Sequence, residues 1–273
     1  MTEVEWLECD SPTPLLDTLG TVSTRKRLLF GVACCRRVAC LLTDRRAANG
    51  LALVEQFADG AVGSAELTSA RSDVGDALDD AFAERYNTEA DVNFCTHPVY
   101  SAAVAMECAV YAVGGLFDQA AGEQWTQERG SPASNDRLPH EQAAWAAYCY
   151  AESFIVWAYD SQPGGKQRSP TYKVASVLSK QVQLSEAELQ ATLLRDIFGN
   201  PFCPTSFIPE WRTDTVMTLA AQMYKSRDFS AMPILADALQ DAGCDNEDVL
   251  SHCRGPRPHV KGCWVVDLVL GKE

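Results

Sequence analysis

Residues 24–42 read TRKRLLFGVACCRRVACLL and carry the clearest helical pattern of the chain. Apolar residues recur here in steps of three and four, from Leu28 through Val32 and Cys35 to Leu42. That spacing places them on one face of an amphipathic helix, which needs other elements to cover it. The stretch therefore predicts a long early helix and a core built from helices.

Signals for helix starts recur on both sides of this stretch. Thr2 with Glu5 fits a capping box, in which each side chain bonds the other residue's backbone N–H, and Ser185 with Glu188 fits a second one. Asp44 is placed to cap the helix that follows residue 44. Further helices are expected at 97–117, 139–159, 214–226, 232–242 and 245–253.

Alternation with a period of two, the pattern of a half-buried strand, is scarce along the chain. The segment WVVDLVL, residues 264–270, is too short for periodicity to separate a helix from a strand. We therefore expect a mostly α, compact protein of about 10–12 helices, with a helix, a short strand or an irregular segment at its C-terminal end.

One stretch, DSQPGGKQRSPTY at residues 160–172, has the composition of a loop. We interpret it as a linker between an N-terminal helical bundle, residues 1–160, and a C-terminal helical module, residues 173–273. The two parts are expected either to stay separate or to pack as a single domain.

Composition excludes several classes of protein. The chain has 273 residues, 47% of them hydrophobic and 22% charged, which excludes disorder along its whole length. Its formal net charge of −14 argues against a generally basic nucleic-acid binder. The opening MTEVEWLECD lacks the basic and apolar regions of a secretory signal, so we expect a soluble cytoplasmic protein whose 11 cysteines are mostly buried thiols. The apolar stretches at 92–117 and 142–159 each contain a glutamate and are interpreted as core helices rather than membrane spans.

Basic residues concentrate near the start of the chain. Residues 24–46 carry seven cationic side chains against the single carboxylate of Asp44. They form a basic stripe: Arg25, Lys26, Arg27, Arg36, Arg37, Arg45 and Arg46. The stripe predicts either docking to an acidic protein partner or neutralisation inside the chain by acidic helices such as residues 73–84.

Two histidines and two cysteines lie close together near the C-terminal end. His252, Cys253, His259 and Cys263 have the spacing H-C-x5-H-x3-C, in a segment rich in glycine and proline. Imidazole and thiolate are the ligands that zinc prefers, so this segment is a candidate zinc site. In the alternative interpretation His252 caps the end of a helix and the cysteines only pack.

Two carboxylates lie in the middle of expected apolar helices. Glu107 has Tyr111 four residues away, and Glu152 has Tyr148 at the same spacing. Carboxylates in apolar surroundings have raised pKa values and can act as general acids or bases, so the pair is a candidate catalytic site. Alternatively, each accepts a hydrogen bond and only fixes the packing.

A third chemical possibility is a nucleophilic thiol. Cys34, Cys35 and Cys40 lie near Arg36 and Arg37, and nearby cations lower the pKa of a thiol. No known sequence signature of a cysteine enzyme surrounds them.

Both ends of the chain resemble a large family of uncharacterised bacterial proteins. The resemblance rests on RDIFGNPFCP at 195–204, PILADALQDAGC at 233–244, HCRGPRPHVKGCWVVDLVLGKE at 252–273 and RKRLLFGVACCRR at 25–37. In that family the residue after NPF is commonly arginine, whereas it is Cys203 here. The resemblance implies a reusable helical module and assigns no activity or cofactor.

These observations favour a non-catalytic binding or adaptor module that contacts a protein through its basic stripe or its C-terminal segment. The alternative is a metal protein or an enzyme that uses the C-terminal cysteines and histidines, or Glu107 and Glu152.

Overall fold

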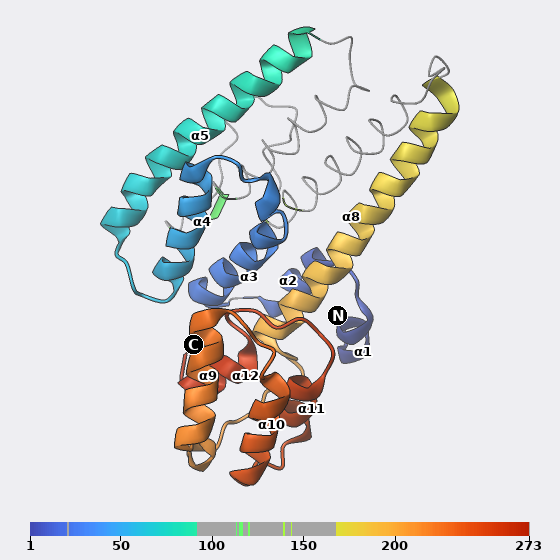
Figure 1. Cartoon of the computed structure of the whole chain (residues 1–273). Helices are drawn as coiled ribbons and strands as arrows, with labels where there is room; N and C mark the ends of the chain where they lie inside the picture. Colours follow the sequence, from blue (N-terminus) through green and yellow to red (C-terminus); the bar gives the residue numbers. More distant parts are fainter. Residues whose placement is uncertain are drawn as a thin grey trace. The chain divides into compact units, whose positions relative to one another are not determined.

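The computed structural model describes residues 1–20, 22–91 and 168–272, together with Val113, Gly115, Leu116, Ala120, Pro139 and Ala143 (Figure 1). Over these residues the chain forms α-helices joined by short 3-10 helices, turns and loops, with no strand. The prediction of a mostly α fold is confirmed. No described helix combines the length and apolar character that crossing a membrane requires.

The chain divides into two compact units. The terminal unit joins residues 1–30 to residues 189–273, and the middle unit comprises residues 31–188. The division therefore lies within two long helices, α3 (Thr24–Arg37) and α8 (Arg168–Phe198). It differs from the predicted halves 1–160 and 173–273 because the first residues of the chain pack with the last ones.

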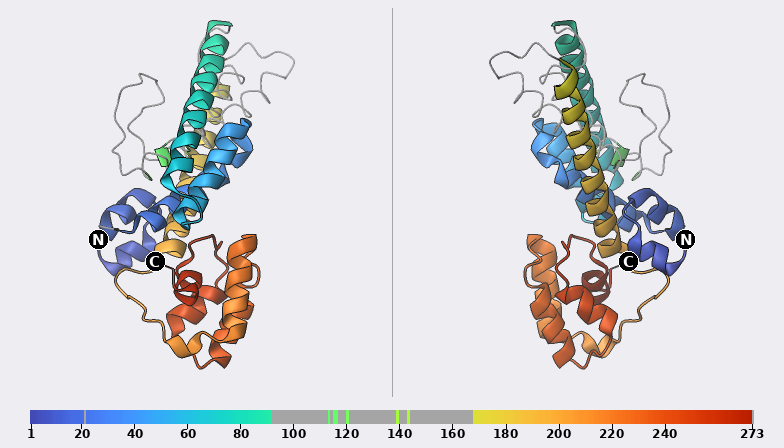
Figure 2. Two further views of the ribbon diagram at one scale, coloured as in Figure 1. Left: turned by 90° about the vertical axis from the view of Figure 1, so that its left-hand side faces the viewer. Right: turned by 90° about the vertical axis from the view of Figure 1, so that its right-hand side faces the viewer.

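The terminal unit contains mainly short helices, joined by the ends of α3 and α8. Besides these two, its helices are α1 (Glu3–Glu8), α2 (Pro12–Leu19), the 3-10 helix η2 (Pro209–Trp211), α9 (Asp214–Ser226), α10 (Met232–Asp241), α11 (Glu247–Arg254) and α12 (Trp264–Leu270). Helix α10 packs on α9 and α11, and α12 contacts the same two helices (Figure 2). The open question at residues 264–270 is settled in favour of a helix.

Local capping explains several of these helix starts. The capping box at Thr2 and Glu5 is confirmed, with the Thr2 N–H donating to Oε2 of Glu5 at 2.7 Å. The side chain of Thr213 accepts from the backbone N–H of Val216 to begin α9. Asn246 does the same for α11.

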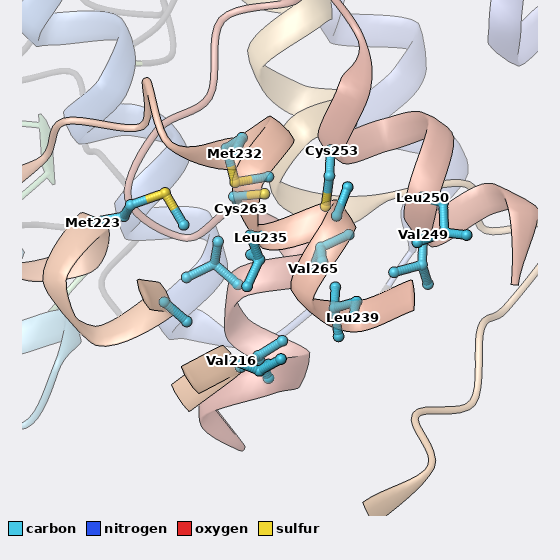
Figure 3. Close-up of a cluster of buried hydrophobic side chains, with 14 of the residues drawn as sticks. Val216, Met223, Met232, Leu235, Leu239, Val249, Leu250, Cys253, Cys263 and Val265 are labelled. Carbon is cyan, nitrogen blue, oxygen red and sulfur yellow. The ribbon is translucent and has the colours of Figure 1, made fainter. Parts of the chain in front are cut away.

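The core of the terminal unit is apolar and buried (Figure 3). It joins α9, α10, α11 and α12 through side chains that are almost fully excluded from solvent, among them Val216, Leu235, Leu239, Val249 and Val265. Burial of this apolar surface holds the four short helices together, since helices of 7–13 residues are marginal by themselves.

Two predictions were wrong along helix α8. It runs without interruption through Ser185 and Glu188, so their S-x-x-E pattern lies inside a helix and starts none. It also includes residues 168–172, which were predicted to end the linker at 160–172. The physical reason is that Pro170 lies in the first turn of α8, where a proline is tolerated, and no glycine or proline follows it until Gly199.

In the middle unit the described helices are the remaining parts of α3 and α8, the 3-10 helix η1 (Ala39–Leu41), α4 (Arg45–Ala58) and α5 (Ser64–Asp91). Asp44 caps α4 as predicted, accepting from the backbone N–H of Arg46 at 2.7 Å. Helix α4 packs along α5 (Figure 1). The predicted helices at 97–117 and 139–159 fall almost wholly outside the described residues.

Candidate metal centre

Three segments of the terminal unit bring four polar side chains together. Asp196 lies in the last turn of α8, and His252 lies near the end of α11. His259 lies in the loop that follows α11, and Cys263 is the residue before α12. One nitrogen, oxygen or sulfur atom from each of the four lies within 4.8 Å of those of the other three.

The individual distances describe a compact group. Oδ1 of Asp196 lies 2.6 Å from Nδ1 of His259 and 3.2 Å from Nε2 of His252. Sγ of Cys263 lies 3.2 Å from Nε2 of His252 and 3.9 Å from Nδ1 of His259. The group is shielded from water, since only 2% of the Asp196 side chain and 14% of the His252 side chain are exposed.

Asp196 is the anionic centre of this group. Burial raises the pKa of its carboxyl, but the hydrogen bonds and charges of His252 and His259 outweigh burial and hold the pKa below its usual value. Its second oxygen, Oδ2, accepts from the backbone N–H of Val260 at 2.9 Å. Asp196 is therefore an ionised carboxylate whose position is fixed by the loop that carries His259.

The pKa of Cys263 is shifted in the opposite direction from that of Asp196. Burial raises the pKa of its thiol well above the usual value, and the negative charge of Asp196 raises it further. In these surroundings the sulfur keeps its proton unless a cation stabilises the thiolate. Cys263 is therefore no activated nucleophile by itself.

The indole of Trp264 determines which nitrogen of His252 carries a proton. Nε1 of Trp264 lies 3.1 Å from Nδ1 of His252, and an indole N–H can only donate. Nδ1 of His252 therefore accepts, and the proton of the neutral imidazole lies on Nε2, facing Asp196. Nε2 of His259 is buried and has no hydrogen-bond partner.

Gly262 allows the chain to turn directly before Cys263. Its φ is +97°, a conformation that residues with a side chain rarely adopt. A Cβ at this position would lie 3.0 Å from Cδ1 of Leu29. The turn that presents Cys263 thus depends on a residue without a side chain.

Of the predicted zinc ligands, the structure brings three together and separates one. His252, His259 and Cys263 belong to the group, whereas Cys253 does not. Both cysteines belong to the apolar core (Figure 3), and burial raises the pKa of the Cys253 thiol to about 12. Neighbouring helical residues project about 100° apart, so the side chain of Cys253 cannot point into the group where that of His252 does.

Four of the seven cations of the basic stripe form ion pairs with carboxylates among the described residues. Arg45 is exposed. The ion pairs join Arg25 to Asp267, Arg36 to Glu55, Arg37 to Glu186, and Arg46 to both Asp44 and Asp80. Asp80 belongs to the acidic helix at 73–84 that was expected to supply such partners. The interpretation as internal neutralisation is confirmed for these four arginines.

The remaining candidate sites are the thiols of the early helix and the two carboxylates of the expected apolar helices. Cys34 and Cys35 are fully buried, and burial raises the pKa of the Cys34 thiol well above its usual value and that of Cys35 to about 12, which argues against a nucleophile. Glu107 and Glu152, the candidate catalytic carboxylates, lie outside the described residues.

Comparison with protein-family models, with curated proteins and with solved structures found no match to this chain. The resemblance of its two ends to a bacterial family stays a prediction.

Proposed function

We propose that this protein is a metal-binding helical module that holds one transition-metal ion, zinc by preference, through Asp196, His252, His259 and Cys263. The observation that carries the proposal is the convergence of these four side chains, with one atom of each within 4.8 Å of the others. Carboxylate, imidazole and thiolate are all established zinc ligands, and four protein ligands are typical of a structural zinc site.

Two of the four distances are close to those around such an ion, and the 3.9 Å between Sγ of Cys263 and Nδ1 of His259 would close by roughly 0.4 Å when it binds. Tetrahedral zinc separates two nitrogen or oxygen ligands by about 3.3 Å, and a nitrogen from a sulfur by about 3.5 Å. Nε2 of His252 lies 3.2 Å from both Oδ1 of Asp196 and Sγ of Cys263. The 2.6 Å contact between Asp196 and His259 would open by roughly 0.7 Å when the ion replaces the proton between them.

Charge also supports the proposal. Binding would convert the Cys263 thiol to a thiolate, and with Asp196 it would supply two negative charges to a divalent cation. The cation would offset the burial that otherwise keeps this thiol protonated. Metal binding should therefore release protons, and the affinity should fall at low pH.

Trp264 should report on the binding event. A metal on Nε2 of His252 moves the imidazole proton to Nδ1, where it would face the N–H of Trp264 at 3.1 Å. Two donors repel at this distance, so the indole or the imidazole has to turn. We expect the fluorescence of Trp264 to change when the ion binds.

The test is the metal content of the purified protein and its titration with Co²⁺, whose absorption spectrum reveals thiolate ligands. We expect one metal ion per chain, lost in Cys263→Ala and kept in Cys253→Ala. Cys253 is a matched control because both thiols are fully buried in the terminal unit and only Cys263 belongs to the group. A chain that binds no metal, or two variants that bind it equally well, would end the proposal.

The proposed role is structural. The ion would join the end of α8 to the loop between α11 and α12, which are 56 residues or more apart in the chain. A reducing cytoplasm would suit such a site, because its thiol has to stay unoxidised. The alternative of an adaptor that docks through the basic stripe is less well supported, since four of its arginines already pair with carboxylates of the chain.

A further inference from the structure

A cavity of about 720 Å³ lies in the terminal unit beside the four candidate ligands. His252 and Trp264 both line it. Cavities that bind small molecules measure roughly 300–1,000 Å³ and combine apolar walls with a few polar groups. The size of this cavity therefore fits a small organic molecule.

The walls of the cavity are partly aromatic. Trp6, Leu7, Phe198, Trp264 and Leu268 contribute apolar surface. Trp6 is fully buried, and its Nε1–H has no hydrogen-bond partner. A buried donor without a partner is costly, by about 1–3 kcal/mol, and is the kind of group that a bound ligand can satisfy.

Cations line the same cavity. Lys26, Arg195 and Arg257 all contribute to its wall. Arg195 is held in place by hydrogen bonds to the backbone carbonyls of Trp6 and Cys9. The charge of Arg257 acts on Arg195, so two like charges lie near each other here.

Lys26 adds a third positive charge in poorly hydrated surroundings. It is half-buried, and burial lowers its pKa. The carboxylate of Asp267, whose charge attracts Lys26, is already bound by the guanidinium of Arg25 at 2.6 Å.

Two carboxylates also line the cavity, and each accepts a hydrogen bond from a neutral group. Glu3 accepts from the amide of Asn200 at 2.7 Å, and Asp248 accepts from the thiol of Cys203 at 3.3 Å. Within the described part of the chain, neither Lys26 nor Arg257 forms an ion pair with them. Three cations therefore face two carboxylates in the cavity wall, which leaves an excess of one positive charge that an anion can meet.

We propose that this cavity binds a small organic anion, a carboxylate or phosphate ester with an apolar or aromatic body. Its charged group meets Lys26, Arg195 and Arg257, and its body packs against the wall that includes Trp264. The proposal does not depend on the metal ion, because none of these cations belongs to the four candidate ligands.

The test uses 8-anilinonaphthalene-1-sulfonate, a fluorescent anion with an aromatic body, and its uncharged analogue N-phenyl-1-naphthylamine. We expect the folded wild-type chain to bind one molecule of the sulfonate at least about tenfold more tightly than the neutral analogue. Phenyl phosphate and benzoate should displace the sulfonate, and inorganic phosphate should do so less well. Equal affinity for the charged and the neutral probe would overturn the proposal without any variant.

Paired substitutions then locate the binding site. The double variant Lys26→Gln, Arg257→Gln should bind the sulfonate at least about tenfold less tightly, a loss of about 1.4 kcal/mol or more. The double variant Arg27→Gln, Arg254→Gln is the matched control, since it removes two cations from neighbouring positions that do not line the cavity. Equal losses of affinity in the two double variants would place the probe elsewhere and refute the proposal.

Discussion

Replacing Gly262 by alanine tests how closely the chain must approach Leu29 as it turns before Cys263. The φ of +97° at this position should cost an alanine about 1–3 kcal/mol in backbone strain. The new Cβ would also lie 3.0 Å from Cδ1 and 3.2 Å from Cβ of Leu29. Leu29 is almost fully buried and has little room to move, so crowding should add about 1–3 kcal/mol. The free energy of unfolding should therefore fall by about 2–6 kcal/mol.

Gly243 provides the control for backbone strain alone. Its φ is +88°, and no atom lies within 4 Å of the Cβ that an alanine would add. Gly243→Ala should therefore lose only the strain contribution, and Gly262→Ala should be less stable than this control by about 1–3 kcal/mol.

Urea unfolding followed by tryptophan fluorescence measures both variants, since Trp211 and Trp264 lie in the terminal unit. With a denaturant slope of about 2 kcal/mol per molar, the midpoint of Gly262→Ala should lie about 0.5–1.5 M below that of Gly243→Ala. Equal midpoints would refute the claim that contact with Leu29 requires glycine here. Crowding against Leu29 should also displace Cys263, the next residue, so Co²⁺ binding should weaken in Gly262→Ala and stay unchanged in Gly243→Ala.

Three further predictions concern charges and thiols. Arg25→Met should lower the free energy of unfolding by about 3 kcal/mol, because it leaves the buried carboxylate of Asp267 unpaired. Arg27→Met, on the exposed side of α3, should change it by less than about 0.5 kcal/mol, and similar urea midpoints for the two variants would contradict this. Because the folded-state pKa of Asp196 is lowered, its stabilising contribution is complete above its unfolded pKa of about 3.9 and is lost as the pH falls through the folded value. The stability difference between the metal-free wild type and Asp196→Asn should thus shrink below about pH 4, and a difference that stays constant from pH 6 to pH 2 would argue against the ionised carboxylate. Ellman's reagent should modify the exposed Cys40 in the native protein and reach Cys263 only after unfolding, so native labelling of Cys263 would disprove its burial.

Local signals predicted much of the fold. Helix α9 occupies Asp214–Ser226, the range expected from the sequence, because its cap at Thr213 acts within one helical turn. The capping-box pattern at Ser185 and Glu188 failed because the same two residue types are also tolerated inside a helix, and no breaker lies nearby. Local patterns therefore predict where a helix can start, and the surrounding chain determines whether it does.

The sequence predicted only those ligands of the candidate metal centre that lie close together along the chain. His252, His259 and Cys263 were found because they lie within twelve residues of one another. Asp196 was missed, since it is 56 residues away from His252 and nothing around it in α8 differs from an ordinary helical aspartate. Cys253 was included because it lies within the same twelve residues, although adjacent residues such as His252 and Cys253 seldom bind one ion, since they project in different directions from a helix.

The composition of the terminal unit has a consequence for how the chain folds as it is synthesised. Residues 1–30 are synthesised before the middle unit, yet the segment with which they form a unit, residues 189–273, is synthesised after it. At synthesis rates of about 5–20 residues per second, the middle unit is complete roughly ten seconds before that segment. During this interval Trp6 and Leu15, which are fully buried in the finished protein, lack the C-terminal part of their unit. Nascent chains stalled before residue 189 should therefore expose the N-terminal segment to proteases and chaperones, and completed chains should protect it.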